Sequence, residues 1–126
     1  MKTFFALGAI FGALGVVFGA FGAHALRESF DEFPKAREWY ETGVLYHLLH
    51  ALALFAASRV RGAGARGAAT AFGVGIVLFS GSLYLLALTR VTRWGMVTPF
   101  GGLAFLVGWA LLAVAVWRES RSTGDA

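Results

Sequence analysis

Four long apolar stretches, separated by short polar segments, dominate the sequence. They cover residues 3–25, 39–58, 67–89 and 95–117. A helix needs about 20 apolar residues to cross the hydrocarbon core of a bilayer. Lipid admits only helices and closed barrels, and these runs are continuous rather than alternating. The pattern therefore predicts an all-α fold in one membrane domain: an integral four-helix bundle built from two transmembrane hairpins.

The segments outside these stretches are polar. Within residues 26–38, Leu26, Phe30 and Phe33 recur at helical spacing, with charged residues on the opposite side. This spacing predicts a short amphipathic helix lying in the membrane interface between the first two spans. Residues 118–126 are expected to form a polar tail.

Aromatic and basic residues near the ends of the spans bear on orientation. Trp39, Tyr40 and Trp94 on one side, and Trp117 on the other, fit the aromatic belts of a bilayer. The expected location is the cell (inner or plasma) membrane. Basic residues accumulate on the cytoplasmic side of membrane proteins, and their count on the two sides favours cytoplasmic N- and C-termini by one residue. Six lie on the side of the termini (Lys2, Arg59, Arg61, Arg66, Arg118, Arg121) and five on the other (Arg27, Lys35, Arg37, Arg90, Arg93).

The first stretch also imitates a secretory signal peptide. Lys2 precedes an apolar core that ends in the small-residue sequence Ala23-His24-Ala25. That core is longer than the apolar region of about 7–15 residues found in signal peptides. We therefore expect a retained span rather than a cleaved one.

The composition agrees with a membrane location. Hydrophobic residues make up 58% of the 126 residues and charged residues 14%, and the mean hydropathy is +0.69. Soluble domains average about 25% charged residues. The lipid bilayer is thus the expected partner and nucleic acid is not, despite the net charge of +4. The absence of cysteine excludes disulfides, thiolate metal sites and iron–sulfur clusters.

Glycines follow a regular spacing along the first stretch. They recur at intervals of four, three, four and three residues, which places them on one helix face (Gly8, Gly12, Gly15, Gly19, Gly22). Small residues let helices approach closely in lipid. This predicts helix packing within the bundle, or alternatively the interface of a homo-oligomer or a larger membrane complex. Gly101 and Gly108 predict a second packing seam in the last span.

A few polar side chains fall inside the spans, all toward one membrane face when the four helices alternate in direction. They form a candidate polar pocket open to that face (His24, Tyr46, His47, His50, Ser80, Ser82, Tyr84, Thr98). Counted from Thr42, His50 lies eight residues into its span, or about 12 Å at helical rise. Polar residues in membranes are costly and are often functional.

The histidines raise the question of a bound group. His47 and His50, three residues apart, share a helix face, and His24 would add a third imidazole for a metal. A haem, metal or quinone held between His24, His50 and Tyr84 is one alternative. Glu41, at the start of the second span, is the only carboxylate in the four spans and lies near enough in sequence to be tested as a partner of a ligand histidine. No carboxylate lies deeper in the spans to complete a catalytic triad. The residues therefore predict no catalytic group, no metal and no cofactor.

Four motifs, in order, resemble one known family. They are Gly19-Ala20-Phe21-Gly22-Ala23-His24, Thr42-Gly43-Val44-Leu45-Tyr46 with His50, Leu78-Phe79-Ser80-Gly81-Ser82-Leu83-Tyr84, and Thr98-Pro99-Phe100-Gly101-Gly102 with Gly108-Trp109-Ala110-Leu111. Together they resemble the bacterial YgdD-like membrane proteins of unknown function, which have small eukaryotic relatives. The resemblance implies a four-helix inner-membrane protein and supplies no reaction. His47 does not obviously fall on a motif position.

Three functions remain open on the sequence. The favoured one is a non-enzymatic structural, assembly or accessory component of the membrane with a one-sided polar pocket. The second is the metal-, haem- or quinone-binding redox module. The third is a small ion channel or transporter, which is disfavoured because proton-coupled transport usually needs a carboxylate within the membrane.

Overall fold

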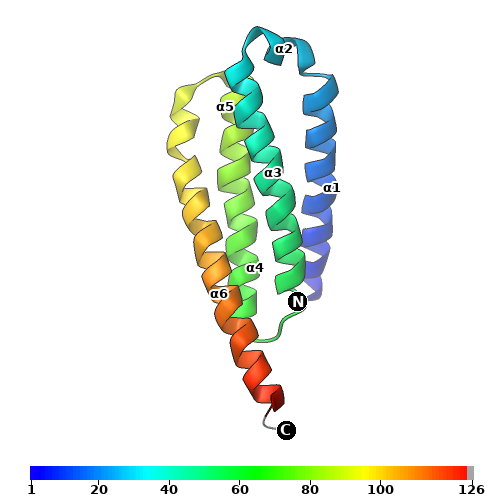
Figure 1. The fold of residues 1–126 in the computed structure, drawn as a ribbon, viewed down its shortest axis with the longest axis vertical. Coiled ribbons are helices and arrows are strands. Elements are labelled where there is room, and N and C mark those ends of the chain that lie inside the picture. The colour runs from blue at the N-terminus through cyan, green and yellow to red at the C-terminus, as the bar shows by residue number, and fades with distance from the viewer. Residues whose placement is uncertain (125–126) are drawn as a thin grey trace.

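Four helical rods run alternately up and down, and a short helix closes one end (Figure 1). The computed structural model describes residues 1–124. The α-helices are α1 (Lys2–His24), α2 (Arg27–Glu32), α3 (Pro34–Ala57), α4 (Ala63–Gly75), α5 (Gly81–Thr89) and α6 (Thr98–Gly124). A π-helical segment, η1 (Ile76–Ser80), joins α4 to α5, and a 3-10 segment, η2 (Thr92–Met96), precedes α6. The predicted all-α fold is confirmed.

Three of the rods are long and apolar enough to cross a membrane. They are Lys2–His24, Ala63–Thr89 and Thr92–Gly124, each with a mean hydropathy above 2 over its most apolar window. The fourth rod, α3, has 24 residues, but charged residues occupy its first two turns. The chain is thus a membrane protein with about four main helices and three long apolar candidate spans.

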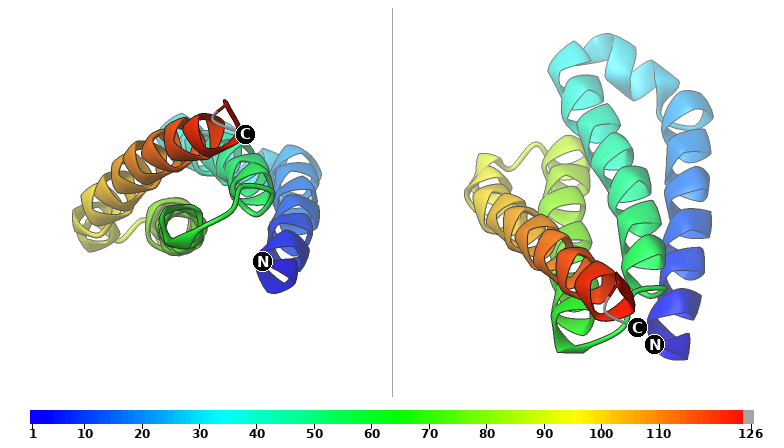
Figure 2. Two further views of the ribbon diagram at one scale, coloured as in Figure 1. Left: turned by 90° about the horizontal axis from the view of Figure 1, so that it is seen from below. Right: turned by 60° about the horizontal axis from the view of Figure 1, so that its bottom comes forward.

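The rods do not form a symmetric bundle. α3 is central and contacts α1 on one side and α4, η1 and α5 on the other, while α6 packs on α4 and η1. Seen from below, α1 lies at one edge of the group and the beginning of α6 at the opposite edge (Figure 2). α1 therefore rests mainly on α3, and only 11% of its most apolar window is buried.

Glycines make the close contacts of α1 possible. Gly8, Gly15 and Gly22 are buried, seven residues apart, against α3. A Cβ added at Gly8 would lie 3.0 Å from the backbone nitrogen of Phe55, whereas one added at Gly12 would meet nothing within 4 Å. Gly12 thus departs from the predicted packing face, whereas Gly19 stays on it, since a Cβ there would lie 3.3 Å from the Val44 side chain.

The second glycine seam is also a helix contact within the chain. Gly101 and Gly108 of α6 are buried. A Cβ at Gly108 would lie 2.7 Å from the ring of Phe72 in α4, and one at Gly101 would overlap the backbone of Phe79 in η1. Gly101 and Gly108 therefore lie where α6 packs against η1 and α4, which is the packing role that the sequence predicted.

The predicted interfacial segment divides at Pro34. Residues 27–32 form α2, and the remaining residues begin α3, with Pro34 in its first turn. Phe30 of α2 is buried against Tyr40, with ring centroids 5.4 Å apart. The apolar side of α2 therefore covers the end of the α1–α3 hairpin, and the expectation that this side lies in lipid was wrong for Phe30.

Two other expectations about the ends of the helices need correction. Tyr40 is buried, and its hydroxyl donates to the carbonyl of Phe18 at 2.5 Å, so it is not part of an aromatic belt. α6 continues through Gly124, so residues 118–124 of the predicted tail are helical. Residues 125–126 lie outside the described part of the chain.

Candidate functional site

The first polar contact inside the bundle joins α3 to α5. His47 is buried, and its Nδ1 lies 2.9 Å from the hydroxyl of Tyr84. Gly43 makes room for this tyrosine, since a Cβ there would lie 2.9 Å from the Tyr84 ring. Phe18 of α1 stacks on the other side of Tyr84 at 4.8 Å between centroids. The pair is thus enclosed by three helices.

The second imidazole nitrogen of His47 has no hydrogen-bond partner among the described residues. It faces α1, where a Cβ on Gly15 would lie 3.4 Å from the His47 Cδ2. The carbonyl of Phe11 is on this side but lies outside hydrogen-bond geometry. A buried polar nitrogen without a hydrogen-bond partner lowers the free energy of unfolding by about 1–3 kcal/mol.

His50 makes a different set of contacts, one turn further along α3. Its Nδ1–H donates to the carbonyl of Tyr46 at 2.8 Å, and its Nε2 accepts the indole N–H of Trp109 at 3.2 Å. These two bonds fix the tautomer with the proton on Nδ1. The ring also stacks on Phe105 with centroids 3.5 Å apart. Both nitrogens are therefore occupied, and the Nε2 lone pair that a metal would need is already used.

Tyr46 and His50 line a groove between α3 and α6 with a volume of about 360 Å³. Gly102, Phe105 and Trp109 of α6 form its opposite wall. The Tyr46 side chain is 40% exposed. Its hydroxyl has no hydrogen bond to any residue that the structure describes.

The serines bind backbone and side chains of neighbouring helices. Ser80 is fully buried and donates to the carbonyl of Gly43 at 2.7 Å. Ser82 and Thr98 are 2.6 Å apart between α5 and α6. Ser80 ends η1, where the N–H of Gly81 bonds the carbonyl five residues earlier. A π-helical turn inserts one residue into a helix and changes which side chains face a neighbour; here it accompanies the bond from Ser80 to α3.

The eight predicted site residues thus divide among separate contacts. His24 is exposed at the end of α1, and the structure does not bring it to the other histidines. Among the described residues there is no group of three His, Cys, Asp or Glu side chains suited to a metal. Counted from the start of α3 at Pro34, Tyr46, His47 and His50 lie 12 to 16 residues along the helix, or about 18–24 Å at helical rise.

Several residues of these contacts were not predicted as site residues. Phe105 and Trp109 complete the surroundings of His50, and Gly43 supplies both space for Tyr84 and the acceptor for Ser80. The Gly-Trp pair in the last motif was visible, but nothing in the sequence tells which helix faces His50. Pairing between distant helices is set by tertiary packing.

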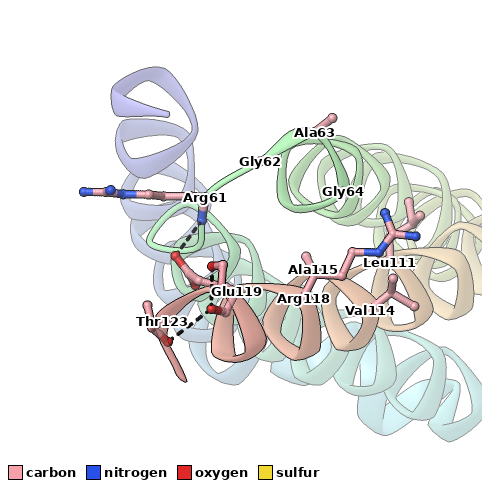
Figure 3. Close-up of a pocket in the computed structure, with 11 residues that line it drawn as sticks. Arg61, Gly62, Ala63, Gly64, Leu111, Val114, Ala115, Arg118, Glu119 and Thr123 are labelled. Atoms are coloured by element: carbon pink, nitrogen blue, oxygen red, sulfur yellow. Dashed lines mark hydrogen bonds between the residues drawn. The ribbon is translucent and has the colours of Figure 1, made fainter. Parts of the chain in front are cut away.

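A larger cavity lies at the opposite end, between the start of α4 and the last turns of α6. Its volume is about 540 Å³. Figure 3 shows Arg118 reaching along the gap between the two helices, while the side chain of Arg61 points away from it. The backbone N–H of Arg61 donates to the Glu119 carboxylate at 3.4 Å. The cavity is therefore lined by both basic and acidic residues, and the hydrogen bond to the Glu119 carboxylate comes from the backbone.

With these contacts described, the chain can be compared with known proteins. Residues 18–102 match the family described as "Protein of unknown function (DUF423)". The chain belongs to this family. It is 44% identical over 120 residues to the UPF0382 membrane protein YwdK of Bacillus subtilis, covering 91% of this chain and 96% of that protein. It is 40% identical to the UPF0382 inner membrane protein YgdD of Escherichia coli, covering 90% and 88%.

A UPF0382 membrane protein of Staphylococcus epidermidis is 39% identical over 121 residues, with 94% of this chain and 98% of that protein covered. No solved structure matches the chain significantly. The resemblance to the YgdD-like family is confirmed, as is the location: this is a multi-pass protein of the cell or inner membrane, in a family whose function is unknown.

Proposed function

We propose that this protein is a non-enzymatic component of the membrane that packs beside other membrane-embedded helices, either copies of itself or subunits of a larger complex. The supporting observation is that polar side chains inside the bundle form hydrogen bonds between its helices. Tyr40, Ser80 and His50 bond from one helix to another, as do the pairs His47–Tyr84 and Ser82–Thr98. Such bonds hold helices together, and the one hydroxyl that lies beside a base, that of Tyr84 at His47, is buried between helices.

The same proposal includes α3 as a fourth span. With 24 residues it is about 36 Å long at helical rise, which exceeds the hydrocarbon core of about 30 Å. It is antiparallel to α1 and to α4–α5, both of which lie within candidate spans, and it packs between them. Because a helix inside this group would be screened from lipid on two sides, its polar residues are tolerated there.

Charge supports an orientation with both termini in the cytoplasm. The end with the termini carries six basic residues, against five at the end with α2. Arginine and lysine accumulate on cytoplasmic loops. A fusion of a fluorescent protein to the C-terminus should fluoresce, and a fusion of alkaline phosphatase there should be inactive; the reverse pattern would contradict this orientation.

The surface that we assign to association is the outer side of α1. Ile10, Val16 and Val17 are each more than half exposed on it. A photoreactive benzophenone amino acid at Val16 should give a discrete protein adduct in native membranes. The protein should also migrate as a defined assembly larger than its 13.4 kDa chain when it is excised from the membrane with its lipids. A monomer with only lipid adducts would overturn the association.

The alternatives receive less support from the contacts. A redox site built from His24, His50 and Tyr84 requires three side chains that lie in different surroundings, since His24 is exposed and Tyr84 bonds to His47. A proton-coupled transporter would be expected to place a carboxylate inside the membrane. The helices α1, α4, η1 and α5 carry none, and the carboxylates of α3 and α6 lie near the ends of those helices.

A further inference from the structure

The groove between α3 and α6 contains an unpaired donor at an unusual depth. Tyr46 packs on Phe79, with ring centroids 4.6 Å apart, and its ring is 6.3 Å from that of Phe105. Phe79 lies one residue from the centre of the apolar stretch 67–89, and Phe105 lies one residue from the centre of 95–117. Tyr46 is therefore near the middle of the bilayer, if α3 crosses it as proposed.

A phenol at this depth needs an acceptor. No hydrogen bond joins the Tyr46 hydroxyl to a described residue, and its side chain is 40% exposed. Leaving a hydroxyl unpaired in an apolar medium is unfavourable. The ester carbonyls of phospholipids lie at the interface, about 15 Å from the bilayer centre. They cannot supply the missing acceptor.

The rest of the groove is aromatic and open to lipid. His50 and Phe105 stack on each other at its floor, and Trp109 donates to His50, so these groups are already paired. Leu45 and Leu106 at its rim are 60% and 68% exposed. A volume of about 360 Å³ lies within the usual range of ligand sites, which are mostly apolar with a few placed polar groups.

We propose that this groove binds the head group of an isoprenoid quinone. A quinone ring is flat and stacks on aromatic side chains, and its carbonyl oxygens accept hydrogen bonds without donating them. Its uncharged head enters the bilayer interior, where the Tyr46 hydroxyl lies, while the isoprenoid tail stays in lipid past Leu45 and Leu106. The quinone is a bound ligand that Tyr46 anchors.

The experiment uses the full chain in nanodiscs of phosphatidylcholine, with ubiquinone-2 as the probe. In a background that keeps Trp109 as the only tryptophan (Trp39→Phe, Trp94→Phe, Trp117→Phe), ubiquinone-2 should quench its fluorescence in a saturable manner. Tyr46→Phe removes one oxygen atom and keeps the ring. It should weaken binding about three- to tenfold, the usual effect of losing one hydrogen bond.

A second variant fills the groove. A Cβ at Gly102 would meet only the Phe79 ring, at 3.8 Å, an ordinary contact, and Gly102 lines the groove. We therefore expect the longer side chain of Gly102→Leu to occupy groove volume. It should abolish saturable quenching. Gly12→Leu, the same change where a Cβ meets nothing within 4 Å, should leave quenching intact.

Other outcomes overturn the inference. Quenching that rises linearly and equally in all variants would mean that the quinone only partitions into lipid. Saturable quenching that is unchanged by Tyr46→Phe would place the ring elsewhere. Binding by a protein that is monomeric in native membranes would refute the association proposed above while keeping this site, and an assembly that shows no binding would do the opposite.

Discussion

Alanine substitutions at Gly101 and at its neighbour Gly102 test whether α6 packs closely against η1, because both changes have the same effect on helix propensity. A Cβ at Gly101 would overlap the backbone nitrogen of Phe79 and would lie 2.7 Å from its Cα. These are backbone atoms of η1, which cannot rotate away. The start of α6 would have to move by about 1 Å to restore a carbon–carbon separation of ~3.6 Å. At the neighbouring Gly102, a Cβ would lie 3.8 Å from the Phe79 ring, an ordinary contact.

The magnitude of the effect follows from these distances. Overpacking costs about 1–3 kcal/mol. A displaced α6 also weakens the bonds Ser82–Thr98 and His50–Trp109, each worth about 0.6 kcal/mol between membrane helices. Replacing glycine by alanine within a helix raises the free energy of unfolding by up to about 1 kcal/mol. We expect Gly101→Ala to lower the free energy of unfolding by about 1–3 kcal/mol and Gly102→Ala to leave it unchanged or raise it by up to about 1 kcal/mol.

The assay is reversible unfolding of the two variants in mixed micelles as the fraction of denaturing detergent rises, followed by far-ultraviolet circular dichroism. In the background that keeps Trp109 as the only tryptophan, its fluorescence reports on the position of α6, because its indole donates to His50 of α3. Equal stability of Gly101→Ala and Gly102→Ala would refute the close approach of α6 to η1. So would a stabilised Gly101→Ala.

Two further predictions concern α1 and the α2 end. Gly15→Leu should destabilise the protein, because even its Cβ would lie 2.6 Å from the Leu48 side chain. The control Val16→Leu, at a 63% exposed position, should not. Thermal melting in mild detergent compares the two variants, and equal melting temperatures would contradict the packing role of Gly15. The hydrogen bond from Arg37 holds the pKa of Asp31 below its usual 3.8. The stabilisation from this pair is therefore fully present above pH 3.8 and is lost as the pH falls through the lowered pKa. Arg37→Gln should return the Asp31 pKa toward 3.8 in a carboxyl NMR titration, and an unchanged titration would count against the pair.

Long-range pairing explains why the candidate site was predicted only in part. The polar residues were identified because lipid makes each of them exceptional in a run of apolar neighbours. Their contacts were not, because His47 and His50 are three residues apart yet turn to different partners, Tyr84 and Trp109. Which partner each side chain meets depends on how α5 and α6 are placed around α3.

The packing of the first turns of α3, which begin at Pro34, could not be predicted from the sequence. Tyr40 illustrates the same point, since its sequence position suits a membrane interface but its ring lies between Phe30 and Tyr84. An aromatic residue near the end of a span packs inward when a covering element such as α2 is available.

The sequence by itself determined the membrane location, the helical fold and the approximate extent of the main helices. The length and apolarity of a segment decide whether it can lie in lipid, and only a few backbone structures are permitted there. It also indicated the glycine contacts, since heptad spacing places Gly8, Gly15 and Gly22 on one face. Tertiary structure alone decided that α1 rests mainly on α3, that a π-helical turn accompanies the bond from Ser80 to Gly43, and that Tyr46 faces an aromatic groove without a partner. These features arise from helix–helix packing in lipid, which depends on the shapes of surfaces distant in sequence and leaves no local pattern.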